Sequence, residues 1–334
     1  MQNPRRSQAK GRRLYRDVLN AFGAEFGLMF VLIFGGCCSN AWALESTTKI
    51  LPASGSLLTL VQFAATALVA LVGQLEWHTV GTWTIPCVKR PVVPLRRWIV
   101  QVVLYYATSL LNNSAFAYHI PMSVHIVFRS GGMVVNMLLG WAVDNKRYSV
   151  LQIASVAMVS IGVVVATISA AQPAQTTTGS TEEYVIGVLL LSLALISSGT
   201  MGIFQEHTYA MYGREHWHEA LFYSHLFALP LFLFNWQSIT RQIKLANATQ
   251  LQWIGTQEMG VYVPSYYIVL LLNVLTQLLC VNGVNRLTSQ VSSVSVSLVL
   301  VVRKAASLLI SVVWLNGSKG NTSLWGGATA VMLA

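Results

Sequence analysis

Two adjacent basic side chains lie midway along an apolar stretch that is long enough to cross a membrane. Residues 291–315 are almost all apolar or small, and Arg303 and Lys304 stand near their centre. A charge at that depth costs ~2.5–3.5 kcal/mol on insertion scales, so it usually marks a functional site. The alternative is a helix that packs through its serines while both bases extend to an interface roughly 15 Å away, which exceeds their reach. We therefore expect Arg303 and Lys304, with Ser307 one turn after Arg303, to bind an anion.

A third basic residue, in the fourth apolar stretch, shares a helix face with other polar groups. His125, Arg129, Gly132, Asn136 and Gly140 follow one another at intervals of three or four residues, which places them on one face. The guanidinium of Arg129 offers a bidentate fork that suits phosphate. Taken singly, His125 and Asn136 can equally be hydrogen-bonded polar residues between helices. With Arg129 between them, the pattern favours a second part of the anion site.

The carboxylates stand away from these three bases. None of the 11 Asp and Glu residues falls at the middle of an expected span. A buried cation without a carboxylate partner is costly, so the expected partner is a multiply charged anion such as a phosphate or diphosphate. The same pattern argues against a proton relay and against a phosphate-transferring enzyme with an Asp-rich Mg²⁺ site. We therefore predict neither a metal nor a cofactor.

The composition indicates a polytopic membrane protein embedded in a lipid bilayer. Of the 334 residues, 54% are hydrophobic and only 10% are charged, and apolar stretches recur at span length. The net charge of +10 is explained better by membrane topology than by binding to nucleic acid. The four cysteines lie in or beside apolar stretches without metal-site or disulfide spacing, so we expect them to be packing residues.

Nine apolar stretches of span length and a shorter tenth follow a basic N-terminal segment. The spans are expected at about 22–44, 56–75, 98–118, 121–143, 148–170, 184–204, 220–236, 261–284 and 291–315. The tenth begins near residue 324 and is too short to cross by residue 334, so we expect an incomplete last helix. Longer polar connections are expected at 76–97 and 237–260.

The distribution of basic residues predicts which side of the membrane each connection faces. Fourteen of the 21 Lys and Arg residues fall on the side of the N-terminus, and four fall on the other side. The positive-inside rule therefore places the N-terminus in the cytosol. Three glycosylation sequons then fall on the opposite side, at Asn247, Asn316 and Asn321.

The two halves of the chain echo one another in position. Arg129 stands twenty residues before Ser149, and Arg303 stands twenty residues before Ser323, each in the fourth helix of a five-helix half. Because five is odd, the second half enters from the opposite side, which gives an inverted repeat with its site near the midplane. We therefore predict an all-α bundle of ten helices, divided into a basic cytosolic segment 1–20, a first repeat 21–171, a polar linker 172–183 and a second repeat 184–334.

Seven short motifs, in order along the chain, resemble the nucleotide-sugar transporters of the drug/metabolite transporter superfamily. They are GCCSN at 36–40, Asn112-Asn113, HIVFRSG at 125–131, MGIFQE at 201–206, EALFYSH at 219–225, NVLTQ at 273–277 and VVRKAAS at 301–307. The most similar branch is that of the UDP-N-acetylglucosamine and UDP-xylose transporters. The resemblance implies a transporter and not an enzyme. It implies exchange of a cytosolic UDP-sugar for luminal UMP across the Golgi or endoplasmic reticulum membrane.

The resemblance also implies roles for particular residues. Arg303 and Lys304 match a phosphate-contacting motif, and residues 222–225 match a nucleotide-recognising motif in which Ser224 replaces the usual asparagine. Tyr223 can instead be an aromatic at a bundle interface, and Asn273 with Gln277 can link helices or contact the sugar. The candidate substrate-binding residues are Asn113, His125, Arg129, Ser130, Asn136, Phe222, Tyr223, Ser224, His225, Asn273, Gln277, Arg303, Lys304 and Ser307.

Two other functions are left open by the sequence. One is a translocator of another phosphorylated metabolite with the same fold, and the other is a membrane-embedded glycosyl- or phosphotransferase. The preferred UDP-sugar, the choice between Golgi and endoplasmic reticulum, and the formation of a homodimer are also left open.

Overall fold

The computed structural model describes residues 23–51, 54–80, 83–115, 131–170, 181–255 and 260–310. Predictions for the N-terminal segment, for the tenth span and for His125, Arg129, Ser130, Asn316 and Asn321 lie outside these residues. The side chains of Asn113, Lys304 and Ser307 also lie outside the description, although their helices are within it.

The described chain is mostly helical, as its apolar composition predicts. A π-helix, η1 (Leu32–Gly36), leads into α2 (Cys37–Ile50). It is followed by α3 (Gly55–Gly73), α4 (Leu95–Ala115), α6 (Gly132–Asp144), α7 (Val150–Ala170), α8 (Thr181–Tyr212), α9 (Trp217–Ala228), α10 (Trp236–Asn247), α11 (Ser265–Gln290) and α12 (Ser293–Ile310). Helices pair their own backbone groups, which is the condition for crossing lipid. Among the described residues, Gly23–Thr47, Gly55–Gly73, Glu182–Tyr212 and Ser265–Gln290 are long and apolar enough to span a membrane. The chain is therefore a polytopic membrane protein.

Two of the polar connections contain β-hairpins, so the expectation of a purely helical chain is wrong there. Strands β1 (Leu75–Val80) and β2 (Trp83–Val88) pair antiparallel, with Leu75 opposite Val88. Strands β3 (Leu251–Gly255) and β4 (Gly260–Pro264) pair in the same way. Both segments are rich in the aromatic and β-branched residues that favour strands. As a result, α11 begins at Ser265 and not near residue 261.

The seventh predicted span, 220–236, is not one continuous α-helix. Helix α9 ends at Ala228, and a 3-10 helix, η4 (Leu229–Asn235), carries Pro230 in its first turn. Proline lacks a backbone N–H and clashes with the preceding turn, so regular α-helix does not continue through it. The next segment, α10, falls in a region predicted only as polar, yet it buries Ile239 and Ala246 on one face.

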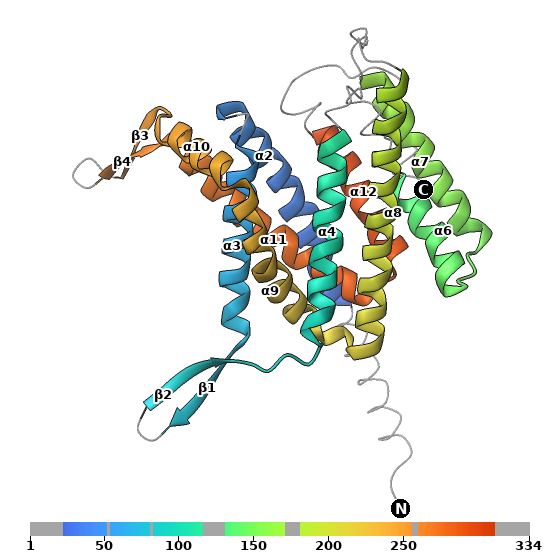
Figure 1. Ribbon diagram of the computed structural model, residues 1–334, viewed down its shortest axis with the longest axis horizontal. Coiled ribbons are helices and arrows are strands. Elements are labelled where there is room, and N and C mark those ends of the chain that lie inside the picture. The colour runs from blue at the N-terminus through green and yellow to red at the C-terminus, as the bar shows by residue number, and fades with distance from the viewer. Residues whose placement is uncertain are drawn as a thin grey trace, which may run out of the picture.

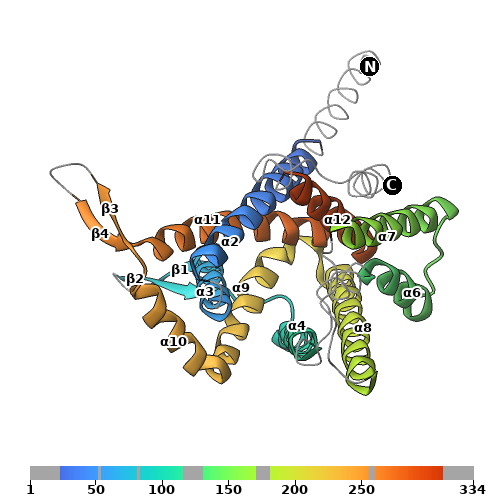
Figure 2. The same ribbon diagram turned by 90° about the horizontal axis from the view of Figure 1, so that it is seen from above.

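The helices are arranged around a few close pairings. Helices α4 and α8 run side by side, α3 packs on α9, and α2 packs along α11 (Figures 1 and 2). Helix α12 contacts α2, α6 and α7. The two hairpins project from opposite ends of the bundle, with β1–β2 beyond the C-terminus of α3 and β3–β4 beyond α10 (Figure 1). We call the end that carries β1–β2 the β1–β2 end.

The seam between α2 and α11 is held by a disulfide that the sequence did not predict. Cys37 and Cys280, expected to be packing residues, are bonded, with their Cα atoms 4.5 Å apart. Glycines permit this approach, because a Cβ on Gly36 would lie 2.9 Å from the backbone nitrogen of Cys280. A Cβ on Gly283 would lie 2.7 Å from the Cβ of Leu32. Spacing along the chain could not reveal the bond, because 243 residues separate the two cysteines.

Candidate substrate-binding cavity

A cavity of about 300 Å³ lies where α3, α4, α8, α9 and α11 meet. We call it the central cavity. Its described lining combines apolar side chains with hydroxyl, imidazole and amide groups, and it includes no Lys, Arg, Asp or Glu. A mostly apolar pocket with a few placed polar groups is typical of a site for an organic ligand. The polar groups come from four helices: Gln101, Gln205, Ser224, His225, Gln277, Asn285 and Thr288.

Two buried oxygens in the central cavity have no hydrogen-bond partner among the described residues. They are Oε1 of Gln101, on α4, and Oγ of Ser224, on α9. A buried polar atom without a partner costs about 1–3 kcal/mol, so native proteins rarely leave one without a reason. A ligand that donates to the Gln101 oxygen, and that either accepts from or donates to the Ser224 hydroxyl, would recover that cost. The cavity is therefore chemically prepared for a polar, uncharged group.

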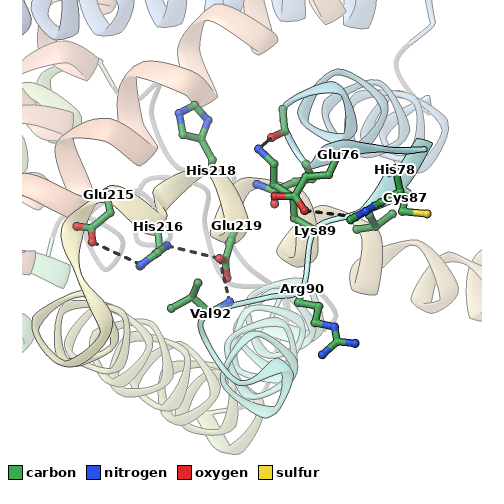
Figure 3. A pocket seen from close by; sticks show the side chains of 13 residues that line it. Glu76, His78, Cys87, Lys89, Arg90, Val92, Glu215, His216, His218 and Glu219 are labelled. Atoms are coloured by element: carbon green, nitrogen blue, oxygen red, sulfur yellow. Dashed lines mark hydrogen bonds and ion pairs between the residues drawn. The ribbon is translucent and has the colours of Figure 1, made fainter. Parts of the chain in front are cut away.

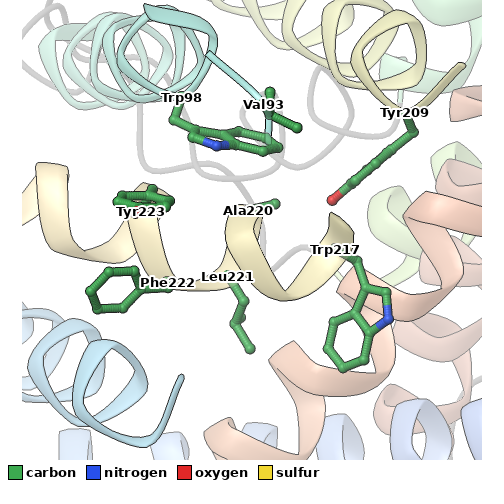
Figure 4. Packing of buried hydrophobic residues seen from close by; sticks show 8 residues of the cluster. All are labelled: Val93, Trp98, Tyr209, Trp217, Ala220, Leu221, Phe222 and Tyr223. Carbon is green, nitrogen blue, oxygen red and sulfur yellow. The ribbon is translucent and has the colours of Figure 1, made fainter. Parts of the chain in front are cut away.

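Helix α9 divides its predicted motif between two faces. Ser224 and His225 line the central cavity, and Nδ1 of His225 lies 2.7 Å from the carbonyl oxygen of Leu221. Phe222 and Tyr223 instead lie in a hydrophobic cluster with Trp98 and other buried side chains, where each is less than a tenth exposed (Figure 4). The geometry thus matches the alternative stated for Tyr223, an aromatic at a helix interface.

The polar pair on α11 is joined to two other helices. Asn273 is fully buried, accepts a hydrogen bond from Nε2 of Gln62 at 2.6 Å and donates one to Oδ1 of Asn40 at 3.0 Å. Gln277 accepts a hydrogen bond from Nδ2 of Asn40 at 2.6 Å and also lines the central cavity. Asn273 therefore links helices, while Gln277 links them and faces the cavity.

Arg303 lies beside the α2–α11 seam and not in the described lining of the central cavity. Its Nη1 donates a hydrogen bond to the carbonyl oxygen of Cys37 at 3.3 Å. Its Nε has no partner among the described residues, so the guanidinium keeps a donor to offer. Asn136 lies elsewhere, between α6 and α12, where its Nδ2 donates to Oγ of Ser297 at 2.7 Å. Arg303 and Asn136 therefore do not lie beside Ser224 and His225 in the described part of the chain.

A second recess, of about 410 Å³, adjoins the central cavity. It lies between the N-terminal half of α3, the C-terminal half of α4 and η4, away from the β1–β2 end. Phe63 and Tyr105 line both spaces. The Phe63 ring centre is 4.7 Å from that of His225 and 5.7 Å from that of Phe232, so this ring stands where the two spaces meet.

At the β1–β2 end, α9 is joined to the segment before α4 by contacts that sequence reasoning missed. Glu219 is buried and accepts hydrogen bonds from the backbone N–H groups of Val92, at 3.0 Å, and Val93, at 3.2 Å, while His216 lies 3.5 Å away (Figure 3). This carboxylate ties α9 to the start of α4. It borders a recess of about 960 Å³ that is also lined by Glu76 of β1 and by Lys89 and Arg90 just after β2. No group of three metal-binding side chains is found among the described residues.

A charged cluster lies where α6, α8 and α12 meet. Nζ of Lys146 is 2.6 Å from Oε1 of Glu206 and 3.1 Å from Oδ2 of Asp144, and His207 is 2.7 Å from Oδ1 of Asp144. Burial acts to lower the pKa of Lys146, but the hydrogen bonds to Glu206 and Asp144 outweigh it and raise the pKa. The motif MGIFQE had singled out Glu206, but one sequence could not show its partner sixty residues away.

Helices that are long and apolar enough to span a membrane place the chain among polytopic membrane proteins. Residues 25–334 match the UAA transporter family, and the chain belongs to that family. It is therefore a transporter and not an enzyme, and the predicted resemblance to nucleotide-sugar transporters is confirmed.

Curated relatives cover most of the chain. The UDP-N-acetylglucosamine transporter yea4 of Schizosaccharomyces pombe is 38% identical over 86% of this chain and 87% of its own. The UDP-xylose and UDP-N-acetylglucosamine transporter of Danio rerio is 35% identical over 85% and 84%. The endoplasmic reticulum GDP-fucose transporter of Drosophila melanogaster is 34% identical over 87% and 83%. A solved crystal structure with 16% identity aligns with a TM-score of 0.56 over 93% of this chain and 97% of its own, which shows the fold alone.

Proposed function

We propose that the chain is an antiporter that carries UDP-N-acetylglucosamine, UDP-xylose or both into the Golgi or endoplasmic reticulum lumen in exchange for UMP. The observation that carries this proposal is the pair of unpartnered oxygens, of Gln101 and Ser224, in a cavity lined by uncharged polar groups. A uracil ring, with its N–H donor and two carbonyl acceptors, has the chemistry that such a lining recognises. Support also comes from the zebrafish and fission yeast relatives, whose names specify these sugars.

The diphosphate needs positive charge, which the described lining of the central cavity does not supply. We assign it to Arg303, Lys304 and Ser307 on α12, joined by His125, Arg129 and Ser130 of the fourth predicted span. The open donor on Nε of Arg303 supports this assignment. A guanidinium matches phosphate oxygens in a bidentate fork. The nucleoside would then contact Ser224, His225 and Gln277.

The remaining predicted site residues are proposed to shape the site from its surroundings. Asn273 fixes Gln277 through the shared contact with Asn40. Phe222 and Tyr223 hold the face of α9 that presents Ser224. Asn136 holds α12 beside α6. Asn113 is proposed to contact the substrate. The protein is proposed to work as a homodimer or alone.

The proposed architecture is a ten-helix bundle of two inverted repeats, 21–171 and 184–334, joined by the linker 172–183. The N-terminus is proposed to be cytosolic, which makes the β1–β2 end the cytosolic end. The recess beside Phe63 then leads from the central cavity toward the lumen. Rocking of one repeat against the other would open each end in turn around the bound substrate.

An uptake panel with purified protein in liposomes tests the substrate class. We expect UDP-N-acetylglucosamine and UDP-xylose to enter vesicles that contain UMP. We also expect GDP-fucose and sugar phosphates without a nucleoside to enter at background rates. Uptake of the sugar phosphates in preference to the UDP-sugars would favour the rival function, a translocator of another phosphorylated metabolite.

Glycosylation in microsomes tests the orientation. Asn247 is exposed near the C-terminus of α10, and its Oδ1 accepts a hydrogen bond from the Tyr267 hydroxyl at 2.6 Å. We expect Asn247 to be glycosylated and segment 237–260 to be protected from external protease in sealed vesicles, with Asn247→Gln as the control that loses the glycan. Cleavage of that segment from outside the vesicles would reverse the proposed orientation.

A further inference from the structure

One carboxylate in the charged cluster holds two separate parts of the chain. Oε1 of Glu206, on α8, pairs with Nζ of Lys146 in the connection after α6. Oε2 of the same residue accepts the backbone N–H of Ser293, the first residue of α12, at 3.0 Å. The first N–H groups of a helix have no partner within it, and a negative charge there also interacts favourably with the helix dipole. Glu206 therefore caps α12 while it is tied to the α6–α7 connection.

Close backbone approach supports the same junction. A Cβ on Gly202 of α8 would lie 3.3 Å from the Cβ of Ser293, and a Cβ on Gly199 would lie 3.0 Å from Oδ1 of Asn136. One turn further along α12, Oγ of Ser297 accepts a hydrogen bond from Asn136. Contacts at two successive turns fix both the rotation and the depth of α12 against α6 and α8.

The position of the α12 N-terminus decides the position of its basic residues. Arg303 and Lys304 follow Ser293 on one helix, about 15 Å along its axis at ~1.5 Å per residue. A helix transmits a shift or rotation of its first turn to side chains at that distance. We infer that Glu206 is a positioning residue, which holds the start of α12 so that Arg303 and Lys304 stand where the substrate phosphate binds. This inference rests on the proposed function.

The test compares a ligand that carries phosphate with one that lacks it. UMP and uridine are used as competitors of UDP-N-acetylglucosamine uptake by the reconstituted full chain. In Glu206→Ala we expect the half-inhibitory concentration of UMP to rise about tenfold, because a charge-assisted cap is lost. That of uridine should stay unchanged. Glu206→Gln retains an acceptor for the N–H of Ser293 and should recover most of the UMP affinity. Asp144→Asn removes a neighbouring carboxylate that does not contact α12, and should match the wild type.

A second pair of variants isolates the capped N–H group, because both lose the Ser293 hydroxyl and only one of them loses the N–H. Ser293→Pro lacks that N–H, and proline is well tolerated at the first position of a helix. Ser293→Ala keeps the N–H and loses the same hydroxyl. We expect the proline variant alone to show the phosphate-selective loss. The positioning role would be overturned if the half-inhibitory concentrations of UMP and uridine rose equally in Glu206→Ala. It would also be overturned if the ratio of these two concentrations were the same in both Ser293 variants. Failure of UMP to compete in the wild-type protein would instead contradict the proposed function.

Discussion

The central cavity and the charged cluster are both polar regions in an apolar bundle, but they differ in whether their polar groups have partners within the protein. In the charged cluster, Nζ of Lys146 pairs with Glu206 at 2.6 Å and with Asp144 at 3.1 Å. In the central cavity, Gln101 and Ser224 each keep a buried oxygen without a described partner. Paired charges hold helices in place, whereas unpaired neutral groups are available to a ligand. The charged cluster is therefore assigned a role in holding helices, and the central cavity a role in contacting the nucleoside.

Arg303 combines both states, because its Nη1 is hydrogen-bonded while its Nε has no partner among the described residues. Its removal should have the largest effect on transport. Arg303→Ala or Lys304→Ala should abolish UDP-N-acetylglucosamine uptake, because the attraction for the diphosphate is lost. Insertion should be normal, since a charge is removed from an apolar span. Uptake is measured in proteoliposomes at matched protein density. Wild-type uptake by either variant would refute the phosphate role.

A matched pair of glutamines tests the contrast between paired and unpaired amides. Gln101→Leu should raise the half-saturating concentration of UDP-N-acetylglucosamine up to about tenfold, the value of one hydrogen bond. Its thermal stability should be unchanged or higher, because a buried oxygen without a partner is removed.

The control for that variant is Gln62→Leu. Gln62 donates to Asn273 at 2.6 Å, so its loss leaves the Oδ1 of this fully buried residue without that donor. We expect a lower melting temperature for Gln62→Leu. If Gln101→Leu had the lower melting temperature of the two and bound substrate normally, the distinction between an unpaired Gln101 and a paired Gln62 would be wrong.

Much of this organisation could be predicted from the sequence, because apolar length is a strong signal. The helices α3, α7, α8 and α11 overlap predicted spans, and the motif around Ser224 led to a cavity face. The disulfide between Cys37 and Cys280, and the backbone contacts made by Glu206 and Glu219, could not be predicted. Each depends on a partner more than sixty residues away, so no local spacing carries it. The hairpins were missed although their strands are rich in β-branched and aromatic residues, because the charged residues and prolines around them indicated only polar connections.

The ion pair of Lys146 should give the smallest effect, and one that depends on pH. Lys146→Met should lower the melting temperature by a few degrees, since a partly exposed pair contributes ~1 kcal/mol at most. The pKa of Lys146 is raised in the folded protein, so its contribution is present below the unfolded pKa and is lost as pH rises through the folded value. The difference between wild type and variant should therefore stay constant from about pH 6.5 to 9 and shrink only in more alkaline solution. A difference that shrinks near neutral pH would contradict the assignment.

The proposed activity is exchange of a UDP-sugar for UMP by a carrier whose intramembrane bases need an anion in either direction. An empty carrier leaves those bases uncompensated, so its reorientation should be slow. The most direct measurement is the initial rate of UDP-N-acetylglucosamine uptake into proteoliposomes with and without UMP inside, at equal pH and with an imposed pH gradient. We predict strong acceleration by internal UMP and little response to the gradient. Equal rates in empty and preloaded vesicles, or accumulation driven by the proton gradient alone, would contradict the account.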